Sequence, residues 1–136
     1  MNMEMHHVGY LVRNIDQSCK DILSPVDEYY TTKTVYDKEQ DAFIKFVWLE
    51  SHIGTSCLEL VQPGSKNKKL IALINKKGDH LYHICYETQN FDFEYEKMLS
   101  NGAIMIKDKK KAIALNNRLV AFFFLRSGLI IELLQK

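Results

Sequence analysis

The chain of 136 residues carries an internal duplication, and this feature limits its possible folds more than any other. Residues 7–16 read HVGYLVRNID and residues 83–92 read HICYETQNFD, so His, Tyr, Asn and Asp recur at an offset of 76. Residues 58–62 (LELVQ) and 131–135 (IELLQ) match at an offset of 73. The two halves differ by about one short loop insertion, and we expect a fold built from two copies of one module.

Each half predicts one strand, one helix and then three strands, which is an α+β pattern. In the first half a helix over 16–23 follows a cap at Asn14–Asp16, and the expected strands are 7–12, 31–36, 42–49 and 55–61. In the second half a helix over 92–101 ends at Gly102, and the expected strands are 82–87, 104–107, 118–125 and 129–134. We therefore expect a single domain with module one at about 5–63, a connecting helix at about 66–78 and module two at about 80–136.

The composition excludes several classes of function. Eighteen basic and 17 acidic residues leave a formal net charge of +1, which gives no case for nucleic acid or an anionic membrane as partner. The longest apolar run, Leu119–Leu125, is too short to span a bilayer, and the first residues do not resemble a signal peptide. Three widely spaced cysteines predict no disulfide framework and favour the cytoplasm. We expect a small-molecule substrate, with a homodimer left open.

The duplicated positions include one His and one Glu in each half. Glu59 and Glu132 each have apolar neighbours on both faces of their strands, where an ionised carboxylate is costly unless it is paired or coordinated. His7 and His83 begin apolar strands at equivalent places. Two copies folded face to face would bring all four side chains together. Two imidazoles and two carboxylates suit one divalent cation, and we expect Ni²⁺, Co²⁺ or Zn²⁺.

Other polar residues lie near these positions. His6 could replace His7 as ligand if the strand register is shifted by one residue. Cys57 and Cys85 lie two residues from Glu59 and His83, and we expect them to be small buried side chains that line the pocket. Lys107–Lys111 (KDKKK) predicts a solvated loop, which could attract an anionic group of a substrate.

Four segments resemble the vicinal oxygen chelate superfamily, particularly glyoxalase I and methylmalonyl-CoA epimerase. They are HHVGYLV (6–12), CLELVQP (57–63), GDHLYHICYE (78–87) and LVAFFF…GLIIELLQ (119–135). The resemblance implies two βαβββ modules that curl into an eight-stranded open half-barrel around the metal. It also implies an isomerase or lyase whose metal chelates two neighbouring substrate oxygens and stabilises an enediolate or enolate. By resemblance Glu132 is the catalytic base, while His7, Glu59 and His83 keep the metal in place.

The sequence departs from both named activities. Tyr82-His83 stands where epimerases typically have a His-His pair, and Ala112–Arg118 replaces their glycine-rich loop. Leu125–Gly128 replaces the turn typical of glyoxalase I. We therefore expect weak or absent methylmalonyl-CoA epimerase activity on a CoA thioester. A smaller anionic substrate, bound by Arg118 or the Lys107–Lys111 segment, fits better.

Two other functions on the same fold stay open. One is a non-catalytic protein that binds and sequesters antibiotics, although such proteins generally lack the complete ligand set. The other is a thiol transferase of the fosfomycin-resistance kind, a group whose typical metal site consists of two His and one Glu. Glu59 counts against the transferase, and against an iron dioxygenase with two His and one carboxylate.

Overall fold

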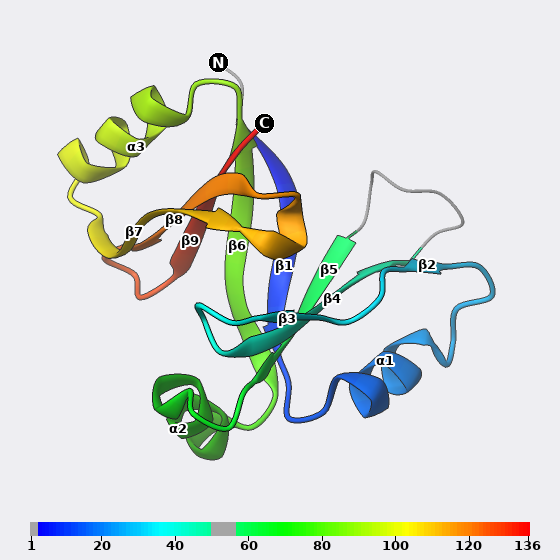
Figure 1. Ribbon diagram of the computed structural model, residues 1–136. Coiled ribbons are helices and arrows are strands. Elements are labelled where there is room, and N and C mark those ends of the chain that lie inside the picture. The colour runs from blue at the N-terminus through cyan, green and yellow to red at the C-terminus, as the bar shows by residue number, and fades with distance from the viewer. Residues whose placement is uncertain (1–2, 50–56) are drawn as a thin grey trace. The chain divides into compact units, whose positions relative to one another are not determined.

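The structure is a computed structural model that describes residues 3–49 and 57–136. The described residues form nine strands and three helices (Figure 1). In chain order these are β1 (Met3–Leu11), α1 (Ile15–Leu23), β2 (Tyr30–Thr31), β3 (Val35–Asp37), β4 (Ala42–Trp48), β5 (Cys57–Pro63), α2 (Lys68–Lys77), β6 (His80–Thr88), α3 (Phe91–Ser100), β7 (Ile104–Ala112), β8 (Arg118–Phe124) and β9 (Ile130–Gln135). A short 3₁₀ helix at Ile113–Leu115 joins β7 to β8.

The predicted order of strands and helices is confirmed in both halves, with two differences. The strand expected over 31–36 is divided into β2 and β3, so nine strands are found where eight were expected. Thr32 lies at this division, where its Oγ1 accepts a hydrogen bond from the Phe46 amide and its carbonyl accepts one from Lys45 Nζ. The strand expected over 104–107 continues to Ala112. Positions 55 and 56 of the strand expected over 55–61 lie outside the described residues.

The chain forms two compact units: the segment up to His7 together with Tyr82–Lys136, and Val8–Leu81. In the Val8–Leu81 unit, β5 pairs in parallel with residues 8–11 of β1 and antiparallel with β4, whose other partners are β2 and β3. Helix α1 covers this sheet through Ile15, which packs with Val12, Val47 and Leu60. Asn14 caps α1 as predicted, because its Oδ1 accepts a hydrogen bond from the Gln17 amide at 2.9 Å.

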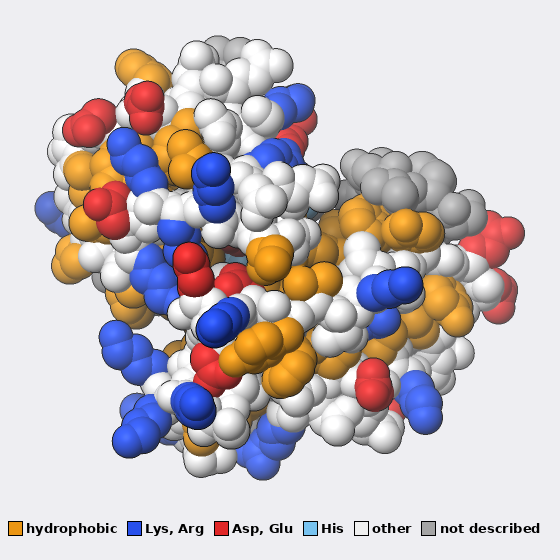
Figure 2. All heavy atoms as spheres, viewed as in Figure 1, with side chains coloured by type: hydrophobic (Ala, Val, Ile, Leu, Met, Phe, Trp, Pro, Cys, Tyr) orange, Lys and Arg blue, Asp and Glu red, His pale blue; other side chains and the backbone are white. Residues whose placement is uncertain are grey.

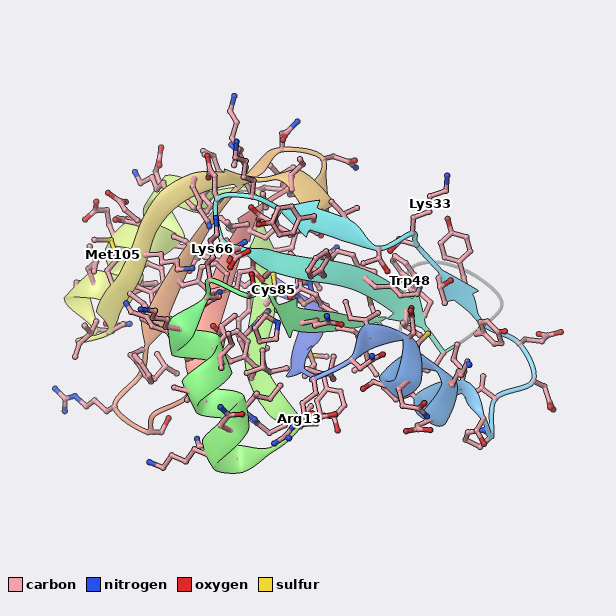
Figure 3. The ribbon with its side chains drawn as sticks, turned by 60° about the horizontal axis from the view of Figure 1, so that its bottom comes forward. Arg13, Lys33, Trp48, Lys66, Cys85 and Met105 are labelled. Atoms are coloured by element: carbon pink, nitrogen blue, oxygen red, sulfur yellow. The ribbon has the colours of Figure 1, made fainter. Side chains whose placement is uncertain are left out.

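Helix α2 is held at both ends by side chains of the same unit. Asn67 caps its first turn by accepting a hydrogen bond from the Leu70 amide at 3.1 Å. At the other end Arg13 donates to the Ile74 carbonyl at 3.1 Å, and Figure 3 shows Arg13 beside this end of the helix. The positive guanidinium there complements the negative end of the helix dipole. Ile74 is the buried residue of this helix.

The connection between β5 and α2 is tied to the turn after β3 through Asp41 and Gly64. Asp41 accepts hydrogen bonds from the Gly64 amide on its carbonyl (2.8 Å), and from Tyr36 Oη (2.6 Å) and the Lys66 amide (2.7 Å) on its carboxylate. A Cβ atom on Gly64 would lie 2.0 Å from Asp41 Oδ1 and 2.4 Å from its Cγ. Only glycine therefore fits beside this carboxylate.

In the second unit, β6, β9, β8 and β7 form a sheet in that order. The β6–β9 pair is parallel, and the β9–β8 and β8–β7 pairs are antiparallel. One face packs beneath α3, where Phe91 and Tyr95 contact Ala121, Phe123 and Leu133. Because side chains alternate along a strand, the neighbours Phe122 and Glu132 project from the opposite face. The α3 side is thus a hydrophobic core, and the opposite face carries the buried Glu132 side chain beside Phe122.

Strand β7 pairs irregularly with β8. The register runs from Met105 opposite Phe123, to Lys107 opposite Phe122, to Lys110 opposite Val120. Each interval leaves one extra residue on β7, which is the geometry of a β-bulge. Lys107–Lys111 therefore belongs to a strand, and the predicted solvated loop is wrong. Within this segment the Tyr95 hydroxyl donates to Asp108 at 2.8 Å, and Lys109 Nζ lies 4.5 Å from the Tyr95 ring centre.

No helix in the described ranges is long and apolar enough to cross a membrane. On the face shown in Figure 2, acidic and basic side chains are interspersed. This agrees with the nearly balanced charge of the sequence.

Candidate metal centre

Three of the four predicted ligands meet within the unit that contains Tyr82–Lys136. His7 lies on β1, His83 on β6 and Glu132 on β9, and their exposed fractions are 1%, 3% and 3%. The parallel register places Ile130 opposite His83 and Glu132 opposite Cys85, so the His83 and Glu132 side chains share one face of the sheet. Strand β9 is buried over residues 131–134, and β6 is buried at positions that include His83 and Cys85.

The three ligand atoms form a nearly equilateral triangle. His7 Nε2 lies 3.1 Å from His83 Nε2, and each of these nitrogens lies 3.1 Å from Glu132 Oε1. Neighbouring ligands of an octahedral ion with bonds of about 2.1 Å lie about 3.0 Å apart. The spacing of this His, His, Glu triad therefore fits donors that converge on one divalent cation.

Glu132 has the electrostatic character of a ligand. Burial raises the pKa of its carboxyl, but the contacts with His7 and His83 outweigh burial and hold the pKa well below its ordinary value. Oε1 is buried, and apart from these two ring nitrogens at 3.1 Å no described residue satisfies it. A buried carboxylate oxygen in this state is unusual, and a coordinated cation would satisfy it.

His6 contacts the far side of the His7 ring. The two Nδ1 atoms lie 2.8 Å apart, so one nitrogen donates a proton to the other. This contact fixes the His7 ring with Nε2 toward the triad, which is how metal-binding imidazoles are commonly oriented. Burial, followed by the neighbouring His7, lowers the pKa of His6. The structure therefore places His7 in the triad, and His6 behind it.

Two further residues line the triad. Cys85, labelled in Figure 3, is fully buried as predicted, and its sulfur forms a second group of potential ligands with His6 and His7. The Phe122 ring meets His83 edge to face, with centroids 5.8 Å apart. The sequence analysis did not predict Phe122 as a site residue. Its position opposite Glu132 across β8 and β9 is a long-range pairing with no local signal in the sequence.

Arg118 is bound to a residue that sequence reasoning did not identify. Its Nη1 donates to Glu87 Oε2 at 2.5 Å, and its Nε donates to the Leu115 carbonyl at 3.3 Å. The side chains of Arg118 and Glu87 are 28% and 16% exposed. The predicted contact of Arg118 with a substrate stays a prediction, and it would require the substrate to compete with Glu87.

Glu59, the fourth predicted ligand, lies on β5 and is 4% exposed. It belongs to the Val8–Leu81 unit, so its role as a ligand stays a prediction. A buried carboxylate needs a partner, whichever group supplies it.

Comparison with known proteins identifies the family. The sequence profile of the glyoxalase/bleomycin resistance protein/dioxygenase superfamily matches residues 6–122. The chain belongs to this superfamily. The resemblance to the vicinal oxygen chelate superfamily is therefore confirmed. No curated protein matches this chain.

Several solved structures show the same fold. A hypothetical protein from Bacillus halodurans has a TM-score of 0.83 at 22% identity, over 100% of this chain and 96% of its own. Methylmalonyl-CoA epimerase from Mycobacterium tuberculosis has a TM-score of 0.81 at 15% identity, over 96% of this chain and 86% of its own. A Streptomyces coelicolor epimerase variant in complex with 2-nitronate-propionyl-CoA has a TM-score of 0.80 at 17% identity, over 97% and 96%. These similarities confirm the predicted α+β fold class.

Proposed function

We propose that this protein is a metal-dependent isomerase or lyase of the glyoxalase or epimerase type. It would remove a proton from the carbon next to the carbonyl group of a small 2-oxo or thioester-like substrate. The observation that carries the proposal is the buried triangle of His7 Nε2, His83 Nε2 and Glu132 Oε1, with sides of 3.1 Å. Membership of the superfamily supports it, since related structures include epimerases.

The triad, with Glu59 as the fourth ligand, would hold one divalent cation such as Ni²⁺, Co²⁺ or Zn²⁺. When bound, the cation would act as a Lewis acid on two neighbouring substrate oxygens. The imidazoles of His7 and His83 are buried and oriented by their neighbours, so they would keep the ligand geometry while substrates exchange.

Glu132 is the residue we assign as the base. Its carboxyl is ionised near neutral pH, because its contacts with His7 and His83 lower its pKa despite burial. The Phe122 ring and the buried Cys85 lie on the same face of the sheet and limit the access of water. A desolvated carboxylate held near the substrate carbon can accept its proton directly.

The methylmalonyl-CoA substrate of the solved relatives suits this chain less well. The segment that replaces the glycine-rich loop contains the 3₁₀ helix Ile113–Leu115, followed by Asn116 and Asn117 with φ of +57° and +60°. Asparagine adopts the left-handed conformation here, and the side chains add bulk that glycine would not. We therefore propose weak or absent epimerase activity toward methylmalonyl-CoA.

The alternative function is a non-catalytic protein that binds a small molecule such as an antibiotic, or a thiol transferase. The three converging ligand atoms favour catalysis over simple binding, because a binding protein has no need of a buried ionised carboxylate. A thiol transferase with a His, His, Glu triad would not use Glu59 as a ligand.

Two measurements on the purified protein test the proposal. Elemental analysis should find about one divalent ion per chain, and electron density should show it at the triad. Exchange of the α-proton into deuterated water should then be followed by NMR with methylglyoxal–glutathione hemithioacetal, methylmalonyl-CoA and simple 2-oxo acids. Metal-dependent exchange with any of them supports an isomerase or lyase. A protein that binds no divalent ion would contradict the proposal, and so would one that binds the ion but exchanges none of these protons.

A further inference from the structure

The two irregular pairings of β7 decide which lysines share a face with the metal centre. In a regular strand Met105 and Lys107 would lie on the same face, because side chains alternate with a period of two. Here Met105 lies opposite Phe123 on the α3 side, whereas Lys107 lies opposite Phe122 on the other side. The second irregularity turns the chain again, so that Lys110 lies opposite Val120 and joins Lys107.

Lys107 and Lys110 each head a row of side chains that leads toward the centre of the sheet. The first row runs from Lys107 through Phe122 to Glu132, since each residue lies directly opposite the next. Side-chain contacts agree with the backbone register: Lys107 Nζ lies 5.9 Å from the Phe122 ring centre, and that ring packs against His83. The second row runs from Lys110 through Val120 to Leu134.

The other two lysines of the segment lie on the α3 face. Lys109 Nζ lies over the Tyr95 ring at 4.5 Å and forms an exposed ion pair with Asp92 at 3.5 Å. Lys111 lies opposite Leu119, which packs against the core beneath α3. One short segment thus presents lysines to both faces, and only Lys107 and Lys110 are directed to the face of the triad.

We infer that Lys107 and Lys110 form an anion-binding subsite beside the metal centre, and that the substrate is a 2-oxo acid with a second carboxylate at its far end. That the metal coordinates the 2-oxo acid end of this substrate rests on the proposed function. Strands lie about 4.8 Å apart, so the backbones of Lys107 and Glu132 are about 10 Å apart. The flexible lysine stem can cover part of that distance along the Phe122 ring, and a five- or six-carbon 2-oxo acid can cover the rest.

The test compares two ligands that differ only in the distal charge. Binding of 2-oxoglutarate and 2-oxovalerate to the Ni²⁺-loaded protein is measured by calorimetry, for the wild type and for single lysine variants. We expect 2-oxoglutarate to bind more tightly than 2-oxovalerate. Lys107→Ala and Lys110→Ala should each reduce the affinity ratio, which is the affinity for 2-oxoglutarate divided by that for 2-oxovalerate, by about 3- to 5-fold. The double variant should reduce it by about 9- to 25-fold if the two lysines act independently, because independent free energies add and the fold-changes multiply. Affinity for 2-oxovalerate should stay within about twofold in each variant.

Lys109→Ala and Lys111→Ala are the matched controls, because they remove the same charge from the same strand but from the other face. They should leave the ratio unchanged. An equal loss in all four variants would overturn the inference in favour of long-range attraction, and an unchanged ratio in Lys107→Ala and Lys110→Ala would also overturn it. If the protein takes up no metal, the proposed function fails separately. Binding of glutarate against pentanoate to the metal-free protein then tests the same lysines.

Discussion

His7 and His83 each direct Nε2 at the same carboxylate oxygen, so the loss of either should open the metal site. We expect His7→Ala or His83→Ala to lower bound metal at least tenfold. The stabilisation by added metal should disappear as well, because a ligand stabilises the folded state only when it binds there. Elemental analysis and thermal unfolding with and without Ni²⁺ check this. His80→Ala is the control, since the His80 ring bonds to the Gly78 carbonyl. Full metal occupancy in both triad variants would disprove the assignment.

Glu132 is expected to act both as ligand and as base, and a change to glutamine separates the two roles. Glu132→Gln should retain measurable metal, since an amide oxygen can still coordinate weakly. Proton exchange should fall by about 10²- to 10⁴-fold, which is the usual contribution of a general base. Glu94→Gln changes another buried glutamate, on α3, and should leave exchange unaltered. Near-normal exchange in Glu132→Gln would mean that another group accepts the proton.

His6 orients the His7 ring without belonging to the triad. His6→Phe keeps an aromatic ring but removes the nitrogen that contacts His7 Nδ1, and we expect the affinity for Ni²⁺ to fall by about tenfold or more. His6→Gln offers an amide in the same region and should recover part of this loss. Equal affinity in wild type, His6→Phe and His6→Gln would show that the contact does not position His7. Metal titration monitored by calorimetry makes the comparison.

At the scale of the elements, the contact between Gly64 and Asp41 predicts a coupled pair of mutations. Gly64→Ala would force the Asp41 carboxylate away from Tyr36 and the Lys66 amide, and should lower the free energy of unfolding by about 1–3 kcal/mol. In an Asp41→Ala background the same change should cost much less, since the clashing atoms are absent. Urea unfolding of the wild type, the two single variants and the double variant measures the coupling free energy between the two positions. Independent effects of the two changes would show that the steric contact is unimportant.

The elements themselves could be predicted where the signals are local. The Asn14 cap, the helix ends near Leu23 and Gly102, and the order of one strand, one helix and then further strands in each half follow from neighbouring residues. The irregular pairing of β7 could not be predicted, because it depends on which residues of β8, a distant part of the sequence, lie opposite. The KDKKK sequence alone is typical of a loop. The division of β2 from β3 depends in the same way on bonds from β4 to Thr32.

For the whole molecule, the buried acid and base groups predict loss of stability in acid when metal is absent. The pKa of His6 is lowered from 6.5, so its contribution is full above that value and declines as pH falls below it. The pKa of Glu132 is lowered from 4.5, so its contribution is present above about 4.5 and is lost as pH falls further. Urea unfolding of chelator-treated protein between about pH 7 and pH 3 should show both declines. His6→Gln should remove the decline of stability that begins below about pH 6.5, and Glu132→Gln the one that begins below about pH 4.5. Stability–pH profiles that are unchanged in these variants would contradict the two pKa shifts.

The residues of the candidate site could be predicted where they occupy positions that are repeated in the two halves of the sequence. His7, His83 and Glu132 are repeated residues in apolar strands, and the structure brings their ligand atoms together. Phe122 and the pairing of Arg118 with Glu87 were missed, because they join positions on different strands that no repeat marks. The orientation of His7 by His6 was missed for a different reason. Adjacent residues in a regular strand point to opposite faces, and that alternation gives no indication of their contact.

The division of the triad between the two sequence repeats has an evolutionary consequence. His7 belongs to the first repeat, whereas His83 and Glu132 belong to the second, yet all three lie in one compact unit. A single repeat therefore carries too few ligands to complete this triad within itself. An ancestor that preceded the gene duplication would have needed two chains that exchanged their first strands, as domain-swapped dimers do. Fusion of the two copies would then have made an intermolecular centre intramolecular and independent of protein concentration.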